Sequence, residues 1–104
     1  MLEDARQHIA KVAALCCVVC RNEGLAIDSP AEIRYIDRRR EGFKREWPAR
    51  FEAIPLCRIH HRIGDGSPRY QGHVAVRKNL FVFENRYGTE SELLRQTMIE
   101  VDMP

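Results

Sequence analysis

The chain has 104 residues, of which 44% are hydrophobic and 31% are charged, and its net charge is +2. This length allows one domain with a modest core, and the composition argues against both an intrinsically disordered chain and a membrane protein. No apolar run approaches the roughly 18 residues of a membrane span. The N-terminal sequence mixes charged and apolar residues in a way that does not fit a secretory signal peptide, so we expect a cytoplasmic protein.

The first predicted element is a helix over residues 2–15, where apolar side chains recur at spacings of three and four residues. It leads into a cysteine-rich segment, residues 16–20, after which Asn22 and Gly24 favour a tight turn. Ser29-Pro30 then interrupts the chain. The segment 32–37 contains β-branched and aromatic residues, which predict a strand.

The sequence of the middle of the chain predicts two strands followed by a helix. Residues 38–48 are too charged for a core, so we interpret them as an excursion between two strands. The second strand covers residues 51–56. Pro55 predicts that it is an edge strand or ends early, because proline lacks the backbone donor that a central strand needs. A short helix follows over residues 57–63, and the glycines and proline of residues 64–68 end it.

Two further helices are predicted near the C-terminus. One lies around residues 79–86 and ends at Gly88, and the other runs from Glu90 to about Glu100. Thr89 and Glu92 have the spacing of a capping box at the start of the last helix. We therefore expect a single domain over residues 1–104, with an N-terminal helix over 2–15, a core over 16–64 and C-terminal helices within about 79–100.

Two pairs of metal-binding residue types share one spacing, Cys17-x-x-Cys20 and Cys57-x-x-His60. In a reducing compartment, four cysteines favour metal binding over disulfides. Zinc prefers four thiolate or imidazole ligands in a tetrahedron, and a closed site of this kind is structural because it leaves no position for water. The sequence therefore predicts one structural zinc ion per chain.

The identity of the four ligands is open at this stage. Cys16 could replace its neighbour Cys17, and His61 could replace His60. In a third interpretation, the cysteines are small core residues and the histidines are surface groups, because buried free cysteine is common. The repeated spacing favours the metal site.

A basic cluster occupies the predicted excursion and its flanks. Such a cluster could attract a phosphate backbone, or it could be a solvated surface loop. Its members are Arg34, Arg38, Arg39, Arg40, Lys44, Arg45 and Arg50, against Asp37, Glu41 and Glu46.

Three segments together resemble a known family. They are Cys17-Val-Val-Cys20, Ile54-Pro-Leu-Cys-Arg-Ile-His-His61 and Phe83-Glu-Asn-Arg-Tyr-Gly-Thr-Glu-Ser-Glu-Leu-Leu94. Over residues 14–97 the chain is similar to the Ref-type RecA-dependent nucleases of temperate phages and to related prophage HNH proteins. The first two segments occur in many HNH proteins, whereas the third is more discriminating. The resemblance implies an α+β fold, a small zinc-stapled ββα-metal (HNH-like) domain with flanking helices. It also implies DNA as substrate and Mg²⁺ at a cleavage centre separate from the zinc.

The chain departs from this family at the cleavage centre, where the family uses one histidine to take a proton from water and others to hold the metal. The family has His-His where Arg34 and Tyr35 stand, and a further histidine where Arg77 stands. Only His61 matches the presumed catalytic set. Arginine has no lone pair for a metal, and tyrosine, with a pKa of about 10, is a poor base near neutral pH. The resemblance thus implies a lost centre, with a positive cleft in its place.

Three functions follow from these patterns. The first is an HNH-like zinc protein that binds DNA without cutting it, through the basic cluster and Arg77. The second is an active HNH endonuclease of recombination, which would need a Mg²⁺ site rebuilt from His61, His73, Asp37 or Glu32. The third is an adaptor or inhibitor that binds a recombinase such as RecA or a host protein. The oligomeric state is left open.

Overall fold

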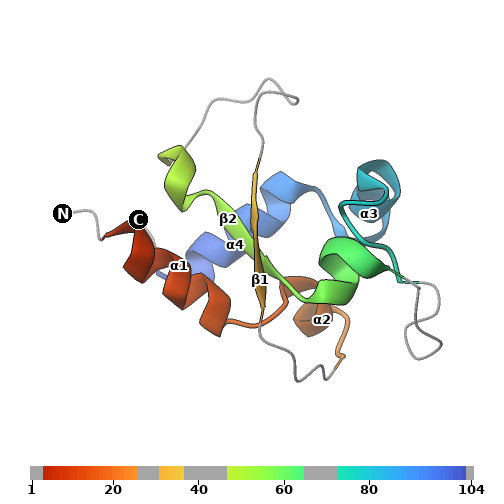
Figure 1. Cartoon of the computed structure of the whole chain (residues 1–104), viewed down its shortest axis with the longest axis horizontal. Coiled ribbons are helices and arrows are strands. Elements are labelled where there is room, and N and C mark those ends of the chain that lie inside the picture. The colour runs from red at the N-terminus through yellow and green to blue at the C-terminus, as the bar shows by residue number, and fades with distance from the viewer. Residues whose placement is uncertain (1–3, 26–30, 37–46, 65–72, 103–104) are drawn as a thin grey trace.

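The computed structural model describes residues 4–25, 31–36, 47–64 and 73–102. In these residues a two-stranded sheet is surrounded by helices (Figure 1), which confirms the predicted α+β class. The elements are α1 (Ala5–Ala14), α2 (Val18–Asn22), β1 (Glu32–Tyr35), the short helix η2 (Ala49–Phe51), β2 (Ala53–Leu56), the π-helical turn η3 (Ile59–Ile63), α3 (Leu80–Tyr87) and α4 (Glu90–Glu100). None of these helices is long and apolar enough to cross a bilayer.

The two strands are antiparallel, with Glu32 opposite Leu56 at one end and Tyr35 opposite Ala53 at the other. The ladder continues one step further, since the Ile36 amide donates to the Glu52 carbonyl at 3.0 Å. Hydrogen-bonded and non-hydrogen-bonded pairs alternate in such a ladder, so Pro55 falls in a non-hydrogen-bonded pair. Its missing N–H therefore costs the ladder nothing, and β2 is an edge strand as predicted.

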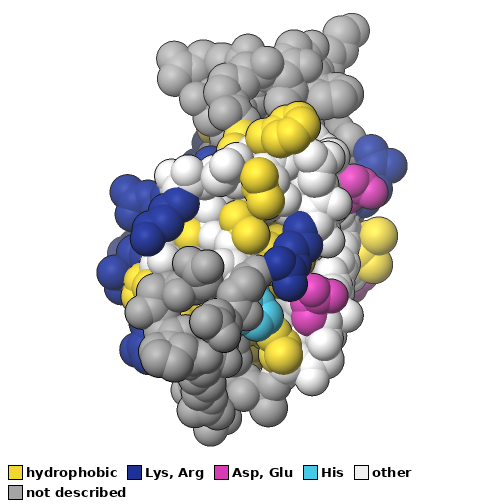
Figure 2. Space-filling model, turned by 90° about the vertical axis from the view of Figure 1, so that its right-hand side faces the viewer, with side chains coloured by type: hydrophobic (Ala, Val, Ile, Leu, Met, Phe, Trp, Pro, Cys, Tyr) yellow, Lys and Arg dark blue, Asp and Glu magenta, His cyan; other side chains and the backbone are white. Residues whose placement is uncertain are grey.

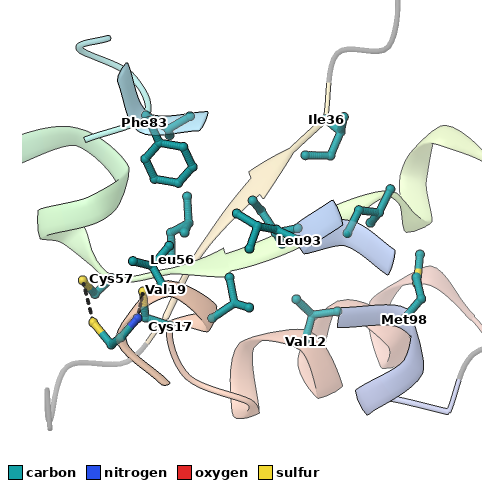
Figure 3. Close-up of a cluster of buried hydrophobic side chains, with 14 of the residues drawn as sticks. Val12, Cys17, Val19, Ile36, Leu56, Cys57, Phe83, Leu93 and Met98 are labelled. Carbon is teal, nitrogen blue, oxygen red and sulfur yellow. Dashed lines mark hydrogen bonds between the residues drawn. The ribbon is translucent and has the colours of Figure 1, made fainter. Parts of the chain in front are cut away.

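The core lies where α1, α2 and α4 meet β2 (Figure 1). Figure 3 shows Val12 of α1 and Met98 of α4 near each other, and α1 and α4, which also carries Leu93, both contact β2. Leu56 and Phe83 extend this core toward the Cys57 end, and both are completely buried. Truncating one such side chain to alanine costs a protein about 2–5 kcal/mol, so this packing fixes the elements that carry the site.

The predicted helices near the C-terminus are confirmed. Asn79 caps α3, and Gly88 separates the two helices with a φ of +108°, a value that favours glycine. The capping box at the start of α4 is present, with the Glu92 amide donating to the Thr89 hydroxyl at 3.1 Å and the Thr89 amide donating to Glu92 at 3.0 Å. α1 begins after its N-cap Asp4, and residues 2 and 3 of the predicted helix lie outside the described residues.

Two differences from the prediction have a clear local cause. The second strand starts at Ala53 instead of Phe51. The Phe51 amide donates to the Pro48 carbonyl at 2.9 Å, so the preceding residues form the short helix η2. The cysteine-rich segment continues as a short helix, α2, before the predicted turn, where Gly24 has a φ of +72°. Residues 38–46 of the predicted excursion lie outside the described residues.

Candidate metal centre

Two short helical segments aim the four candidate ligands at one point. Cys17 is the N-cap of α2, and its sulfur accepts a hydrogen bond from the Cys20 amide at 3.4 Å. Cys57 directly follows β2, and the chain then turns through η3, which carries His60. Both segments contact β2, so the sheet fixes the distance between the two ligand pairs. Gly64, with a φ of +70°, ends the second turn.

The distances among the four side chains fit a tetrahedral zinc site. With ordinary zinc–sulfur and zinc–nitrogen lengths, two sulfurs lie about 3.8 Å apart and a sulfur and a nitrogen about 3.5 Å apart. The Cys20 and Cys57 sulfurs are 3.6 Å apart. The His60 Nδ1 atom lies 3.3 Å from Cys57, 3.4 Å from Cys20 and 3.7 Å from Cys17. All four residues are buried, and the group could hold a metal ion such as zinc.

The structure brings Cys17 and His60, and not their neighbours Cys16 and His61, into the converging group. Cys16 is exposed, has a φ of +65° and directs its sulfur toward the Ala14 carbonyl. Figure 3 shows Cys17 and Cys57 close together at one end of the core. His60 joins that group, whereas His61 turns away to Glu32.

The charges of the four groups depend on one another. Burial opposes a charge on His60, but its hydrogen bonds with Cys17 and Cys57 raise its pKa to about 9. Contacts with Cys17 and Cys20 lower the pKa of Cys57, whereas contacts with Cys17 and Cys57 raise that of Cys20. The lowered pKa of Cys57 and the raised pKa of His60 favour a thiolate beside an imidazolium. A divalent cation would stabilise all three thiolates at once, which fits the chemistry of the set.

The side chains of His73 and Tyr87 both contact the His60 ring. Because His60 directs Nδ1 at the sulfurs, its Nε2–H can donate to His73 Nδ1 at 3.1 Å. The Tyr87 ring packs edge-on against the His60 ring, with centroids 5.2 Å apart. Its hydroxyl accepts a hydrogen bond from the Val74 amide at 3.1 Å, and the Val76 amide donates to the His60 carbonyl at 2.8 Å. Such partners orient a ligand and fix its tautomer.

His61, the remaining residue of the presumed catalytic set, contacts Glu32 of β1. Its Nδ1 atom lies 2.8 Å from the Glu32 carboxylate, and both side chains are partly buried. Arg62 binds the same carboxylate with two nitrogens, at 2.9 Å and 3.1 Å. The Arg62 and His61 contacts lower the pKa of Glu32. A carboxylate therefore orients this histidine.

The predicted nucleic-acid-binding residues have different surroundings. Arg34 is one-quarter exposed, and its Nε donates to the almost completely buried carboxylate of Glu90 at 3.0 Å. Arg77 is exposed, and its amide donates to the His61 carbonyl at 3.1 Å, so it lies beside the presumed centre. Arg38, Arg39, Arg40, Lys44 and Arg45 lie outside the described residues. Their role stays a prediction.

Two of these contacts have no signal in the sequence. The sequence pattern suggests His73 only for a rebuilt catalytic centre, and its contact with His60 spans a segment with no regular pattern. Glu90 is predicted only as a helix start, although it is also the partner of Arg34, 56 residues earlier. Both contacts depend on how separate elements pack, which spacing along the chain does not encode.

A family model described as "Recombination enhancement, RecA-dependent nuclease" matches residues 3–101, nearly the whole chain. No curated protein matches the sequence.

Proposed function

Since the chain belongs to the RecA-dependent nuclease family of recombination enhancement, we propose that it is a zinc-stapled, HNH-type DNA-binding protein whose nuclease centre is lost. In this proposal Cys17, Cys20, Cys57 and His60 hold the structural zinc, which links α2, β2 and η3. The whole chain acts as one domain.

The contact between Arg34 and Glu90 carries the proposal of a lost centre. Arg34 stands where the family has a histidine, and its guanidinium neutralises a buried carboxylate at 3.0 Å. A guanidinium is protonated at any physiological pH and offers no lone pair. A divalent cation close to it would meet electrostatic repulsion and would lack that ligand. Arg77, whose backbone amide donates to the His61 carbonyl, likewise replaces a family histidine with a group that cannot bind a metal ion.

The positive charges that remain support DNA binding. Arg77 is exposed beside the presumed centre, and the basic cluster follows β1 in the chain. Arginine and lysine in such a position contact phosphates rather than base edges, which gives affinity with little sequence preference. Replacing Arg38, Arg39 and Arg40 by alanine should lower the slope of log affinity against log salt by up to about 0.9 for each duplex phosphate that the variant no longer binds. The zinc content should not change.

The test of the lost centre is incubation with single- and double-stranded DNA, with Mg²⁺ or Mn²⁺, with and without RecA filaments. We expect no cleavage under any of these conditions. Cleavage that the His61→Ala variant abolishes would contradict the proposal. A triple arginine variant that binds DNA with an unchanged salt slope would show instead that the cluster is only a solvated surface.

An active endonuclease is the second candidate, because Glu32 orients His61. A carboxylate–histidine pair is a common form of a general base, and its 2.8 Å contact is already formed. His73 is not available to such a centre, since it contacts His60. Asp37 lies outside the described residues. Among the described residues the candidate therefore depends on His61 and Glu32, and Glu32→Gln should abolish any metal-dependent cleavage that the protein has.

An adaptor that binds a recombinase or a host protein has weaker support. Figure 2 shows hydrophobic side chains among lysines and arginines at the end of the molecule that carries α3. Phe81 is 75% exposed and Val82 is 40% exposed in that helix. Isolated apolar residues are normal on soluble proteins, so these two do not identify a partner.

A further inference from the structure

A groove lies between the first half of α1 and the end of β1. It has a volume of about 220 Å³, and its lining consists of Ala5, Arg6, Ile9, Tyr35 and Arg50. None of the four metal-binding candidates contributes to it. The groove combines two apolar side chains, one aromatic ring and two guanidinium groups, so its chemistry differs from that of the surroundings of His61.

The alternation of β1 explains why Tyr35 lines the groove. Successive side chains of a strand point to opposite faces, so Arg34 and Tyr35 diverge although they are neighbours. Arg34 reaches Glu90 at the start of α4, whereas Tyr35 lines the groove with residues of α1. The partner opposite Tyr35 in the ladder is Ala53, a small residue. Tyr35 stays 53% exposed, so part of this residue is accessible to a ligand.

The two arginines lie at the rim of the groove and are accessible. The Arg6 side chain is 96% exposed, and its Nε atom is 3.8 Å from the Asp4 carboxylate, which also caps α1. An exposed pair of this kind contributes little and is readily exchanged for a phosphate. The Arg50 guanidinium lies over the Phe51 ring, 5.2 Å from its centroid, which holds it at the mouth of the groove.

We propose that this groove binds one unpaired nucleobase of a single-stranded nucleic acid, stacked on Tyr35, with the flanking phosphates on Arg6 and Arg50. Stacking on aromatic rings beside basic groups is how proteins bind single strands with little sequence preference. The volume is below the roughly 300 Å³ of the smallest common ligand pockets, so it suits one ring system and leaves the phosphates outside. An apolar protein segment would desolvate both guanidiniums without compensation. The inference rests on the proposed nucleic-acid binding and adds the kind of strand and its contact residues.

The experiment compares three labelled ligands by fluorescence anisotropy. They are an oligothymidylate, an abasic oligonucleotide of the same length, and a duplex. We expect Tyr35→Ala to weaken binding of the oligothymidylate by about 5- to 150-fold, the range for loss of one stacked base. Tyr35→Phe should bind like the parent because it keeps the ring. Phe81→Ala is the matched control, since Phe81 is an exposed aromatic residue on α3, at the opposite end of the molecule (Figure 1).

The arginines provide an independent measurement. Arg6→Ala and Arg50→Ala should each lower the salt slope for the single strand by up to about 0.7, the value for one phosphate contact. The groove is excluded as the site if Tyr35→Ala binds as tightly as the parent, if the abasic strand binds as tightly as the oligothymidylate, or if Phe81→Ala is equally weakened. Duplex binding without single-strand binding would overturn only this inference. A parent that binds neither would overturn the proposed DNA binding as well. Zinc content and melting temperature verify that each variant is folded.

Discussion

His60 and His61 are adjacent in the chain but belong to two regions with opposite properties. His60 faces three sulfurs in a completely buried group whose distances fit a zinc ion. His61 faces Glu32 in a partly exposed region where Arg34 neutralises the buried Glu90. The first region has every group that a metal site needs. In the second, the protein's own cations contact the carboxylates.

This difference follows from what each region does for the fold. Removing one ligand from a buried thiolate group leaves charges without compensation, so a structural site tolerates little change. A partly exposed region tolerates exchange, provided that the replacement still neutralises the carboxylates. Arg34 meets this condition, because its guanidinium supplies a positive charge beside Glu90. The proposed loss of the nuclease centre is thus compatible with an intact fold.

Loss of a metal ligand should have the largest effect. We expect Cys57→Ser to unfold the domain and to abolish stoichiometric zinc binding, because a site that forms only in the folded chain couples metal affinity to folding. The matched control is Cys16→Ser, which removes an exposed thiol next to the group and should leave both zinc content and melting temperature unchanged. Elemental analysis and thermal melting measure these properties. A Cys57→Ser variant that melts like the parent would refute the structural zinc site.

Removal of the Arg34 guanidinium should have the next largest effect on stability. We expect Arg34→Ala to lower the free energy of unfolding by about 3 kcal/mol, because it leaves the buried carboxylate of Glu90 without this cation. Adding Glu90→Gln should recover part of the loss, since a neutral amide needs no counter-charge. Arg77→Ala, an exposed control, should change the free energy by less than about 0.5 kcal/mol. Urea unfolding of the parent and these three variants at neutral pH measures the differences. Equal stability of the single and double variants would show that the pair does not contribute to stability in this way.

The contact between His73 and His60 should affect metal affinity more than the fold. We expect His73→Ala to weaken zinc binding by about 10- to 100-fold, the usual effect of removing a hydrogen-bond partner of a ligand histidine. His61→Ala is the matched control, because it removes the neighbouring imidazole, which contacts Glu32 and not the sulfurs. Competition with a chelator measures the affinity. If both variants lose zinc equally, His73 has no specific role in orienting His60.

The fold was largely predictable because local patterns specify its elements. The period of α1, the asparagine and glycine after Cys20, and the capping box of α4 each depend on neighbouring residues. The segment that best discriminates the family, residues 83–94, also has a largely local structural role, since Gly88 takes a positive φ and Thr89 caps the next helix. The short helix η2 was not predicted, because it results from a backbone hydrogen bond that residue types do not specify.

The candidate site was predictable only in part. The paired spacing identified the metal group, since two short turns aim ligands at one point, but it could not choose between Cys16 and Cys17. The contacts of His73 with His60 and of Arg34 with Glu90 were not predicted, because they join elements that meet only after folding. In the sequence Tyr35 stands out only as a replaced histidine, and the groove that it lines depends on the packing of α1.

The smallest predicted effect concerns the salt bridge between Arg21 of α2, the helix that carries Cys20, and Glu100 of α4. Two hydrogen bonds, at 2.6 Å and 2.9 Å, join them and lower the pKa of Glu100. Because the pKa of Glu100 is lower in the folded state, the salt bridge stabilises the fold at pH values above the ordinary pKa of 4.5. This stabilisation is lost as the pH falls through the pKa of Glu100 in the folded protein. We expect Glu100→Gln to be less stable than the parent by about 0.5–1 kcal/mol at neutral pH, and the difference should vanish in acid. The exposed Glu23→Gln serves as control, and urea unfolding across this pH range measures the difference. A difference that persists in acid would assign the effect to packing instead of charge.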